Sequence, residues 1–516
     1  MVTSRLASIL PLPPLAPRTF GAGRAFVLAL AVALALAVAV NGCAASGSAD
    51  RRAPTGGSGS GGAAAGQAGA AAGQAGAAAD GSTSSGGTAG TSPLPPSPDA
   101  GASDAGAGQD AEVVRPVLGS RPADPAFQFD TTITQAVLER YLSRSISFTQ
   151  LLQDDVTQPV NSMGVDPLDN ARMLFDSKAK FIGRAVFVFG GESNLARNLQ
   201  RAKPFADLLH QADPDIIFQA GAFEIVTTQV DAIAVPASVL TEFGRPVVAR
   251  NFDYASMLFA SGKFVNNWGQ GGSVPDMSRL ETRMWFYYLA TSYIDAGAEA
   301  IHFGQVSLMD QNDPGHVGWF DMLGRVRAYA RLHARRHMVL CDAHTPTGGI
   351  VEGGKLLFDS HAFPLRIEEV AGMPFQGQLQ VGYADSIYTK SKGGVTPSGW
   401  SCAHLPYMVE FDNFGRSNPG QTSNSPFIWG WDEITWFAQQ PIADRNAWLQ
   451  YAWQWVPAHD PVGHLEMPGS RVMSPGAEGG PKWYWANTKS PACPTGFDTE
   501  ATIRGLWSGG GPDGGV

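Results

Sequence analysis

Residues 407–437 read YMVEFDNFGRSNPGQTSNSPFIWGWDEITWF, and this stretch decides what the rest of the chain must build. It opens with strand-like alternation, in which Met408, Glu410 and Asp412 share one face. Unpaired carboxylates are costly inside a core, so this face suits the open end of a parallel barrel, where it meets water and ligand. A loop rich in Gly, Asn, Pro and Ser follows, and three tryptophans come after it.

Strand-like and helix-like runs alternate before this stretch. We expect eight strands, at residues 184–189, 215–220, 246–252, 300–306, 337–342, 356–361, 378–384 and 407–413. Helical periodicity is found at 132–142, 166–178, 194–211, 278–296, 318–336, 432–439 and 442–455. Such alternation predicts parallel strands with crossover helices, and eight units predict an α/β fold of the (β/α)8 TIM-barrel type. Because no clear helix separates 344 from 356, an open doubly wound sheet is the alternative.

Composition divides the chain into five expected parts. Residues 1–42 have the layout of a lipoprotein signal peptide, with an apolar run at 25–40, and Cys43 is the expected lipidation site. An uncleaved anchor is the alternative. Residues 43–114 are a Gly/Ala/Ser-rich linker that cannot bury a core. We expect an N-terminal helical segment at 115–179, the barrel at 180–460 and an irregular, tryptophan-containing extension at 461–516.

Charge and cysteine content limit the partners. The formal net charge of −10 and the lack of a basic run in the folded part argue against nucleic acid. A lipid at Cys43 would attach the protein to a membrane, so we expect it in the bacterial cell envelope, at the outer membrane, or secreted. Cys402 and Cys493 lie in loop-like sequence and can pair after export. Cys341 lies in an apolar strand and is expected to be a buried thiol.

Polar residues stand at the ends of nearly all the predicted strands, where barrel enzymes place their functional groups. Together they predict that this face handles a polar ligand. Tryptophans in the following loops can stack on the apolar faces of sugars, although a lid without a ligand would use them equally. The expected substrate-binding residues are Glu192, Asn251, Asp253, Gln305, Asp342, His344, His361, Trp400, Trp429 and Trp431.

The strand end VEFDNFG and the loop WGWDEITWF resemble the catalytic barrels of glycoside hydrolases. The resemblance covers roughly residues 180–460 and is architectural. It implies a cell-surface enzyme that acts on a poly- or oligosaccharide by hydrolysis or transglycosylation. The fourth predicted strand ends in Gln305, where many retaining glycosidase barrels carry an acid. The mechanism of those enzymes therefore does not transfer directly to this chain.

Hydrolysis of a glycosidic bond commonly uses two carboxyl groups on opposite sides of that bond. We expect Glu410 and Glu224 to form this pair, with Asp412 as a support or as the acting group. In the predicted strand order, Glu192 and Glu224 lie on strands close to that of Glu410. The structural alternative is that Glu410 and Asp412 bind Arg250 or backbone amides and do no chemistry.

Two Asp-x-His pairs support a competing hypothesis. Asp342 and His344 follow one predicted strand, and Asp359 and His361 follow the next, so the four could hold a divalent metal for a metal-dependent hydrolase. The main hypothesis needs no cofactor. A third hypothesis is a barrel that binds carbohydrate without cleaving it.

Overall fold

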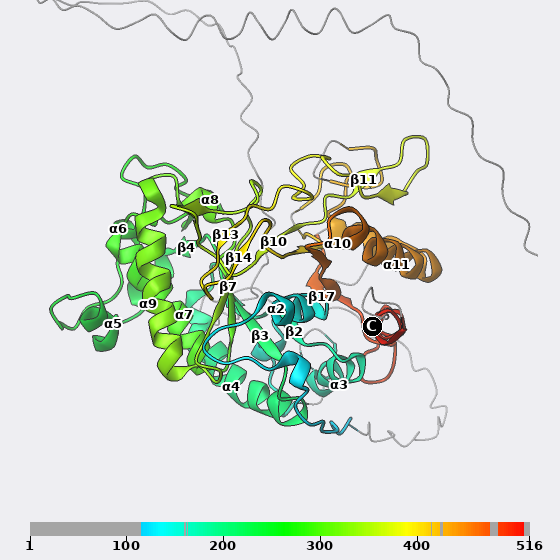
Figure 1. The fold of residues 1–516 in the computed structure, drawn as a ribbon, viewed down its shortest axis with the longest axis horizontal. Helices are drawn as coiled ribbons and strands as arrows, with labels where there is room; N and C mark the ends of the chain where they lie inside the picture. Colours follow the sequence, from blue (N-terminus) through cyan, green and yellow to red (C-terminus); the bar gives the residue numbers. More distant parts are fainter. Residues whose placement is uncertain are drawn as a thin grey trace, which may run out of the picture. The chain divides into compact units, whose positions relative to one another are not determined.

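The computed structural model describes residues 115–158, 161, 164–413, 415–423, 427–474 and 483–509. The expected signal segment, Cys43 and the linker at 43–114 lie outside these residues. Within them the chain forms a mixed α/β structure in which parallel strands are surrounded by helices (Figure 1).

The largest sheet has the strand order β18-β17-β1-β2-β3-β6-β7. All neighbours are parallel except β18, which runs antiparallel to β17. The strands are β1 (Ser145–Phe148), β2 (Phe181–Val188), β3 (Ile217–Ala222), β6 (Ala300–His302), β7 (Leu340–Asp342), β17 (Met467–Val472) and β18 (Trp483–Trp485).

A second sheet has the order β10-β15-β16 and is parallel throughout. Its strands are β10 (His361–Pro364), β15 (Tyr407–Glu410) and β16 (Gly463–Leu465). Two connections link it to the first sheet. His344, just past β7, forms a parallel bridge with Ala362 of β10. On the other side, β16 continues into β17 through Glu466, whose backbone N–H donates to the carbonyl of Val409 at 2.8 Å.

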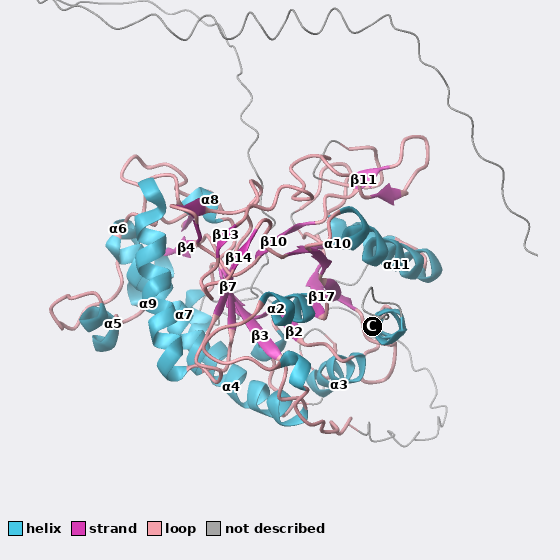
Figure 2. Ribbon diagram, viewed as in Figure 1, coloured by secondary structure: helices cyan, strands magenta, loops and turns pink. Residues whose placement is uncertain are grey.

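Helices connect many of the successive parallel strands (Figure 2), whereas loops and short strands connect β7 to β10 and β10 to β15. α4 joins β2 to β3, α7 lies between β3 and β6, and α9 joins β6 to β7 and packs on α7. Asp166 caps α3 and Asp432 caps α10, each through its carboxylate, which explains where these helices begin. The longer helices are α2 (Gln135–Leu142), α3 (Pro167–Ser177), α4 (Leu195–Ala212), α7 (Leu280–Asp295), α9 (Val317–His333), α10 (Glu433–Gln439), α11 (Ile442–His459) and α12 (Glu500–Gly509).

Short helices and small sheets lie in the loops that connect the main strands and helices. One small sheet has the order β14-β13-β9-β8, and two others pair β11 with β12 and β4 with β5. The elements are α5 (Ala237–Glu242), α6 (Tyr254–Met257), α8 (Val306–Met309), β4 (Val226–Thr227), β5 (Gly272–Ser273), β8 (Val351–Glu352), β9 (Lys355–Leu356), β11 (Glu368–Glu369), β12 (Gly377–Gln378), β13 (Gly394–Val395) and β14 (Ser401–Cys402).

The amino ends of the parallel strands are closed by an apolar cluster. Leu138 and Leu142 of α2 pack there against Phe181, Ile217 and other residues that begin the strands. This end is filled with buried apolar side chains. A site for a polar ligand is therefore expected at the opposite end, where polar residues follow the strands. Among the described residues, no helix combines the length and the hydropathy that crossing a membrane requires.

Two predicted strands are wrong. Residues 246–252 form an extended loop in which Val247 and Val248 are 61 % and 57 % exposed, so their β-branched sequence does not reflect a buried strand. Residues 378–384 contain only the last residue of β12, and the strand expected at 356–361 is found later, as β10. β1 lies in the segment expected to be helical, and β16, β17, β18 and α12 lie in the segment expected to be irregular.

Candidate functional site

Glu410, the last residue of β15, is a buried carboxylate held by three side chains. Both its oxygens accept hydrogen bonds from the guanidinium group of Arg184. Nη1 of Arg471 donates to Oε2 at 2.7 Å, and Nε2 of His344 lies 2.9 Å from Oε1. Burial favours the neutral acid, but Arg184 and Arg471 outweigh it and hold the pKa of Glu410 well below its usual range. Glu410 is therefore a permanent anion at neutral pH.

Arg184 reaches Glu410 because β2 is irregular at this point. Its φ of 57° lies in the left-handed region, and the register between β2 and β3 shifts between Ile182 and Val186. Such a conformation costs an arginine about 1–2 kcal/mol, and a bulge of this kind re-aims a side chain. The backbone N–H of Arg184 donates to Oε1 of Gln219 at 3.2 Å, which helps to hold the irregular conformation. The strain thus places a cation at the centre of the site.

A second group of polar side chains extends from β3, β6 and β7. Nε2 of Gln219 donates to Oδ1 of Asp342 at 2.6 Å, and Nδ1 of His302 lies 2.9 Å from Oδ2. Burial raises the pKa of Asp342 to about 7 and lowers that of His302 well below its usual value. His302 is therefore neutral, and its Nδ1 and the Asp342 carboxyl share one hydrogen bond.

Glu466, the residue between β16 and β17, is a second buried carboxyl beside Glu410. Its Oε1 has no hydrogen-bond partner among the described residues and lies against Gly183, where a Cβ would stand 2.0 Å away. Burial, followed by repulsion from Glu410, raises the pKa of Glu466 to about 8. One carboxyl of the pair is thus ionised and the other protonated, which is the pattern by which proteins separate acid and base roles.

We predict that Glu466 makes stability fall as the pH rises. The ordinary pKa of this carboxyl is 4.5, and its pKa in the folded chain is about 8. Below pH 4.5 both states hold the proton. Between these values the unfolded chain has released a proton that the folded chain keeps, so the free energy of unfolding decreases with pH and levels off above pH 8. Urea unfolding of the full chain and of Glu466→Gln across pH 5–8 measures the difference. Parallel profiles for the two proteins would contradict the assignment.

Half-buried aromatic rings border this polar cluster at the carboxyl ends of β2 and β3. Phe223 packs edge-on against Phe187 and His302, with ring centroids 5.2 and 5.7 Å apart, and the guanidinium carbon of Arg184 lies 6.0 Å from its centroid. Phe189 bridges from Phe223 to Trp268. Such rings next to charged groups suit a ligand with apolar faces and polar edges.

Glu224 lies beyond the end of β3, beside this aromatic group. Its carboxylate accepts hydrogen bonds from the backbone N–H and the side-chain amide of Gln305, at 2.8 and 3.0 Å. The neighbouring carbonyl of Gly304 accepts the N–H of His344 at 2.8 Å, and the ring of His344 contacts Glu410. Glu224 and Glu410, predicted as a pair, are therefore connected through residues 304, 305 and 344 without touching each other.

Asp412 lies beyond β15, which ends at residue 410, and it has partners different from those of Glu410. Its carboxylate is 3.4 Å from Nη1 of Arg366 and accepts the N–H of Asn413 at 2.8 Å. Asn413 in turn accepts from Nη2 of Arg471 at 2.9 Å. Asp412 thus borders the cluster and supports it indirectly. The expected alternative partner, Arg250, instead pairs with Glu281 at 2.7 Å.

Several predicted substrate-binding residues hold the backbone. Glu192 accepts from the N–H and hydroxyl of Thr227, Asn251 donates to the carbonyl of Asp231, and Asp253 caps α6. Of the predicted residues, the structure brings Glu224, Gln305, Asp342, His344 and Glu410 together.

The three predicted tryptophans do not line this cluster. Nε1 of Trp400 donates to the carbonyl of Ile133 at 2.9 Å, and the ring packs on the apolar cluster at the amino ends of the strands. Nε1 of Trp429 donates to the carbonyl of Gln376 at 2.9 Å, and Trp431 packs against the main core. These rings were predicted to bind sugar because they lie in loops rich in Gly, Ser and Pro, and the contacts that the structure shows for them are packing contacts and hydrogen bonds to backbone carbonyls.

The residues of the metal hypothesis have separate partners. Asp359 accepts from Nη2 of Arg327 at 3.2 Å and from the N–H of Cys341 at 3.0 Å, whereas His361 is buried against Gly349. In the described part of the chain, no group of three or more His, Cys, Asp or Glu side chains is arranged to hold a metal ion. Cys402 and Cys493 are free thiols, so the disulfide considered between them is not formed.

Sequence reasoning missed Arg184, His302, Glu466 and Arg471. Arg184 had been assigned as the first residue of a strand, although it lies in the middle of β2. Glu466 and Arg471 fall in a segment taken as irregular because of its Gly and Pro content. The alternation of His464, Leu465, Glu466 and Met467 is the signal that would have indicated a strand with an inward carboxyl.

Comparisons with known proteins give only distant likenesses. No protein-family model and no curated relative matches the sequence. Among solved structures, a debranching enzyme from Nostoc punctiforme is similar at 10 % identity with a TM-score of 0.28, over 46 % of this chain and 53 % of that one. The glycoside hydrolase domain of PelA from Pseudomonas aeruginosa is similar at 11 % identity with a TM-score of 0.23, over 46 % and 78 %. The chain spans about half the length of the debranching enzyme, and likeness at these scores carries no argument about activity.

Proposed function

We propose that the protein is a glycoside-hydrolase-like enzyme that acts on a poly- or oligosaccharide at the carboxyl ends of its parallel strands. The observation that carries the proposal is the environment of Glu410. A carboxylate held as an anion by Arg184 and Arg471 ends a parallel strand beside a cluster of half-buried aromatic rings. A fixed anion can stabilise or trap the positive charge that develops on a sugar ring when its glycosidic bond breaks.

We further propose that the eight parallel segments close into a barrel. The bridge from His344 to Ala362 and the continuity of β16 into β17 support closure. In such a barrel, β6, β7 and β10 lie between β3 and β15 on one side, and β16–β17, β1 and β2 lie between them on the other. Glu224 and Glu410 would then face each other across the mouth, where two carboxyls can flank one bond. This replaces the expected arrangement, in which their strands were near neighbours.

We assign different roles to the two carboxyls. Glu410 cannot donate a proton at neutral pH because two guanidinium groups keep it ionised, so it serves as the nucleophile or as the electrostatic partner of the reacting sugar carbon. Glu224 would lie across the mouth from Glu410 and accepts hydrogen bonds from Gln305, and we assign it the protonation of the departing oxygen because it is the second carboxyl of the pair. No metal takes part in this mechanism.

The proton-donor role predicts a specific response to Glu224→Gln. Hydrolysis of natural glycosidic bonds should fall about 10²–10⁴-fold, because their leaving alcohols need a proton. Hydrolysis of a 2,4-dinitrophenyl glycoside of the same sugar should fall far less, because that leaving group departs as an anion. The kcat/KM values of the full chain and the variant on both substrates measure this, with the exposed Glu352→Gln as the matched control. Equal losses on both substrates would exclude Glu224 as the proton donor.

A carbohydrate-binding barrel without activity is the second candidate. The observation that favours it is that both oxygens of Glu410 are already engaged, as in a structural ion pair. Under this function a glycan would bind the full chain, no reducing ends would be released, and Glu410→Gln and Glu224→Gln would leave glycan binding intact.

We extend the proposal to location. The sequence at 1–43 supports a protein attached to the bacterial cell envelope, at the outer membrane, through lipid on Cys43, with a carbohydrate as its partner outside the cell. Cys43→Ser should then move the full chain from the membrane fraction to the soluble fraction. Unchanged membrane attachment of this variant would indicate the uncleaved anchor instead.

A further inference from the structure

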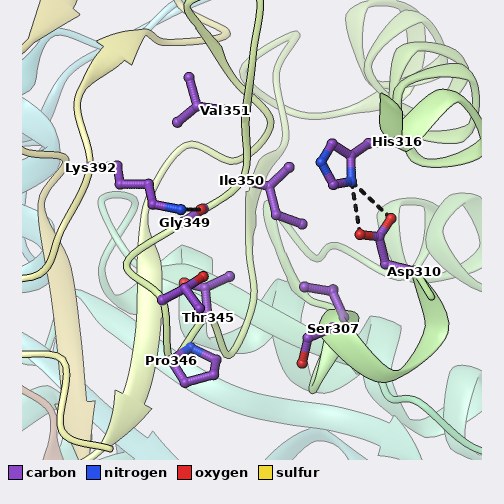
Figure 3. A pocket seen from close by; sticks show the side chains of 11 residues that line it. Ser307, Asp310, His316, Thr345, Pro346, Gly349, Ile350, Val351 and Lys392 are labelled. Atoms are coloured by element: carbon purple, nitrogen blue, oxygen red, sulfur yellow. Dashed lines mark hydrogen bonds and ion pairs between the residues drawn. The ribbon is translucent and has the colours of Figure 1, made fainter. Parts of the chain in front are cut away.

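A pocket of about 210 Å³ lies between the loops that follow β6 and β7. Its walls include Ser307, Asp310, His316, Thr345, Ile350 and Lys392 (Figure 3). At roughly 30 Å³ for each water molecule, this volume corresponds to about seven waters. The pocket therefore fits one small molecule or one monomer of a polymeric ligand. Thr345 directly follows His344, so the pocket adjoins the group that contacts Glu410.

An Asp–His pair forms one wall. Nδ1 of His316 lies 2.9 Å from Oδ1 and 2.8 Å from Oδ2 of Asp310. A carboxylate on Nδ1 fixes the imidazole with its proton on that side. The other ring nitrogen, Nε2, points away from Asp310 and towards Ile350 (Figure 3). His316 has a φ of 55° and follows Gly315 at 70°, and this strain is the kind that persists where a side chain must be aimed.

Two further polar groups line the same space. Thr345 is only 3 % exposed, yet its hydroxyl has no hydrogen-bond partner among the described residues. A buried hydroxyl without a partner costs free energy unless a ligand satisfies it. Lys392 is exposed and uses one of its three N–H donors on the carbonyl of Gly349, at 3.0 Å. Among the side chains that line the pocket, Lys392 therefore offers a cationic group to a carboxylate.

We propose that this pocket is a subsite for one acidic sugar residue, such as a uronic acid, whose carboxylate is bound by Lys392 and whose hydroxyls meet Thr345 and Nε2 of His316. The inference rests on the proposed function, since it names the substrate class of the same face. The hydrogen bond from His316 engages the Asp310 carboxylate, and Lys392 is the group that gives the pocket its preference for an anion. The pocket would select polysaccharides that carry carboxylates.

The test is calorimetric titration of the full chain with three probes: glucuronate, glucose and acetate. We expect saturable binding of glucuronate that is at least about tenfold tighter than binding of either glucose or acetate, because only glucuronate offers both the carboxylate and the hydroxyls. Lys392→Gln should weaken glucuronate binding about tenfold, the value of a hydrogen bond to a charged group. The exposed Lys355→Gln is the matched control and should change nothing.

Thr345→Val separates binding from folding. Removing a buried hydroxyl without a partner should leave the melting temperature unchanged or raise it, while glucuronate binding weakens. No binding of glucuronate, equal binding of glucose or acetate, or unchanged binding in both Lys392→Gln and Thr345→Val would overturn the proposal. Sugar release and glucuronate binding are measured together in the full chain and in Glu410→Gln, because the hydrolase proposal and the subsite proposal can then fail separately. Glucuronate binding without sugar release in any variant would refute the hydrolase and keep the subsite, whereas sugar release without glucuronate binding would do the reverse.

Discussion

Glu410→Gln should lower the rate of sugar release by at least about a thousandfold. The substitution keeps the shape of the side chain but removes the negative charge, and preorganised charge at the reacting centre supplies factors of about 10²–10³ even for single groups. Loss of a nucleophile costs more. A glutamine would also place a neutral amide between the guanidinium groups of Arg184 and Arg471. The values of kcat/KM on the best substrate measure the effect.

Glu352→Gln is the control for this result, since Glu352 is exposed on β8 and is not among the side chains that bind Glu410. A Glu410→Gln protein that folds and retains wild-type turnover would show that Glu410 is only the acceptor of a structural ion pair. Circular dichroism and the melting temperature of both variants establish that they are folded when assayed.

Arg471→Met should destabilise the protein by about 3–5 kcal/mol, because removing one partner of a buried ion pair leaves the other without compensation. The side chain of Arg471 is almost fully buried, and its guanidinium group donates to Glu410, to Ser147 at 3.0 Å and to Asn413 at 2.9 Å. These contacts join β17, β15 and β1. Urea unfolding of the full chain gives the change in the free energy of unfolding.

Arg331→Met is the matched control, because Arg331 is exposed near the end of α9 and should change stability by no more than about 0.5 kcal/mol. Equal stability of the two variants would mean that the buried network around Glu410 is not what links these strands. In that case the account of why Glu410 stays ionised would also fail.

The pattern of helices and central strands could be predicted because it is local. β2, β3, β6, β7 and β15 are apolar runs, and α4 shows helical periodicity over several turns. β1 and β17 were missed because SISF and MPGSRV are short and contain Ser, Gly, Pro or Arg, residues that strand propensity does not favour. Their strand state depends on pairing with neighbouring strands, and the pairing of β1 with β17 joins residues more than 300 positions apart in the chain.

The site was predictable only in part, for the same reason. Glu410 and Glu224 could be proposed because each stands near the end of an apolar strand. The ionised state of Glu410 depends on Arg184, which is 226 positions away in the chain. The side chain of Arg184 is oriented by a left-handed backbone conformation that the local sequence does not predict. The raised pKa of Glu466 likewise arises from burial that only the folded chain creates.

The most direct test of the central claim is the release of reducing ends by the full chain from a panel of neutral and acidic polysaccharides, with and without EDTA. We predict release from at least one polysaccharide, at the same rate in EDTA, and its loss in Glu410→Gln. Release that EDTA abolishes would contradict the carboxylate mechanism in favour of a metal-dependent hydrolase. Binding of a glycan without any release would contradict the enzyme itself and identify a carbohydrate-binding barrel.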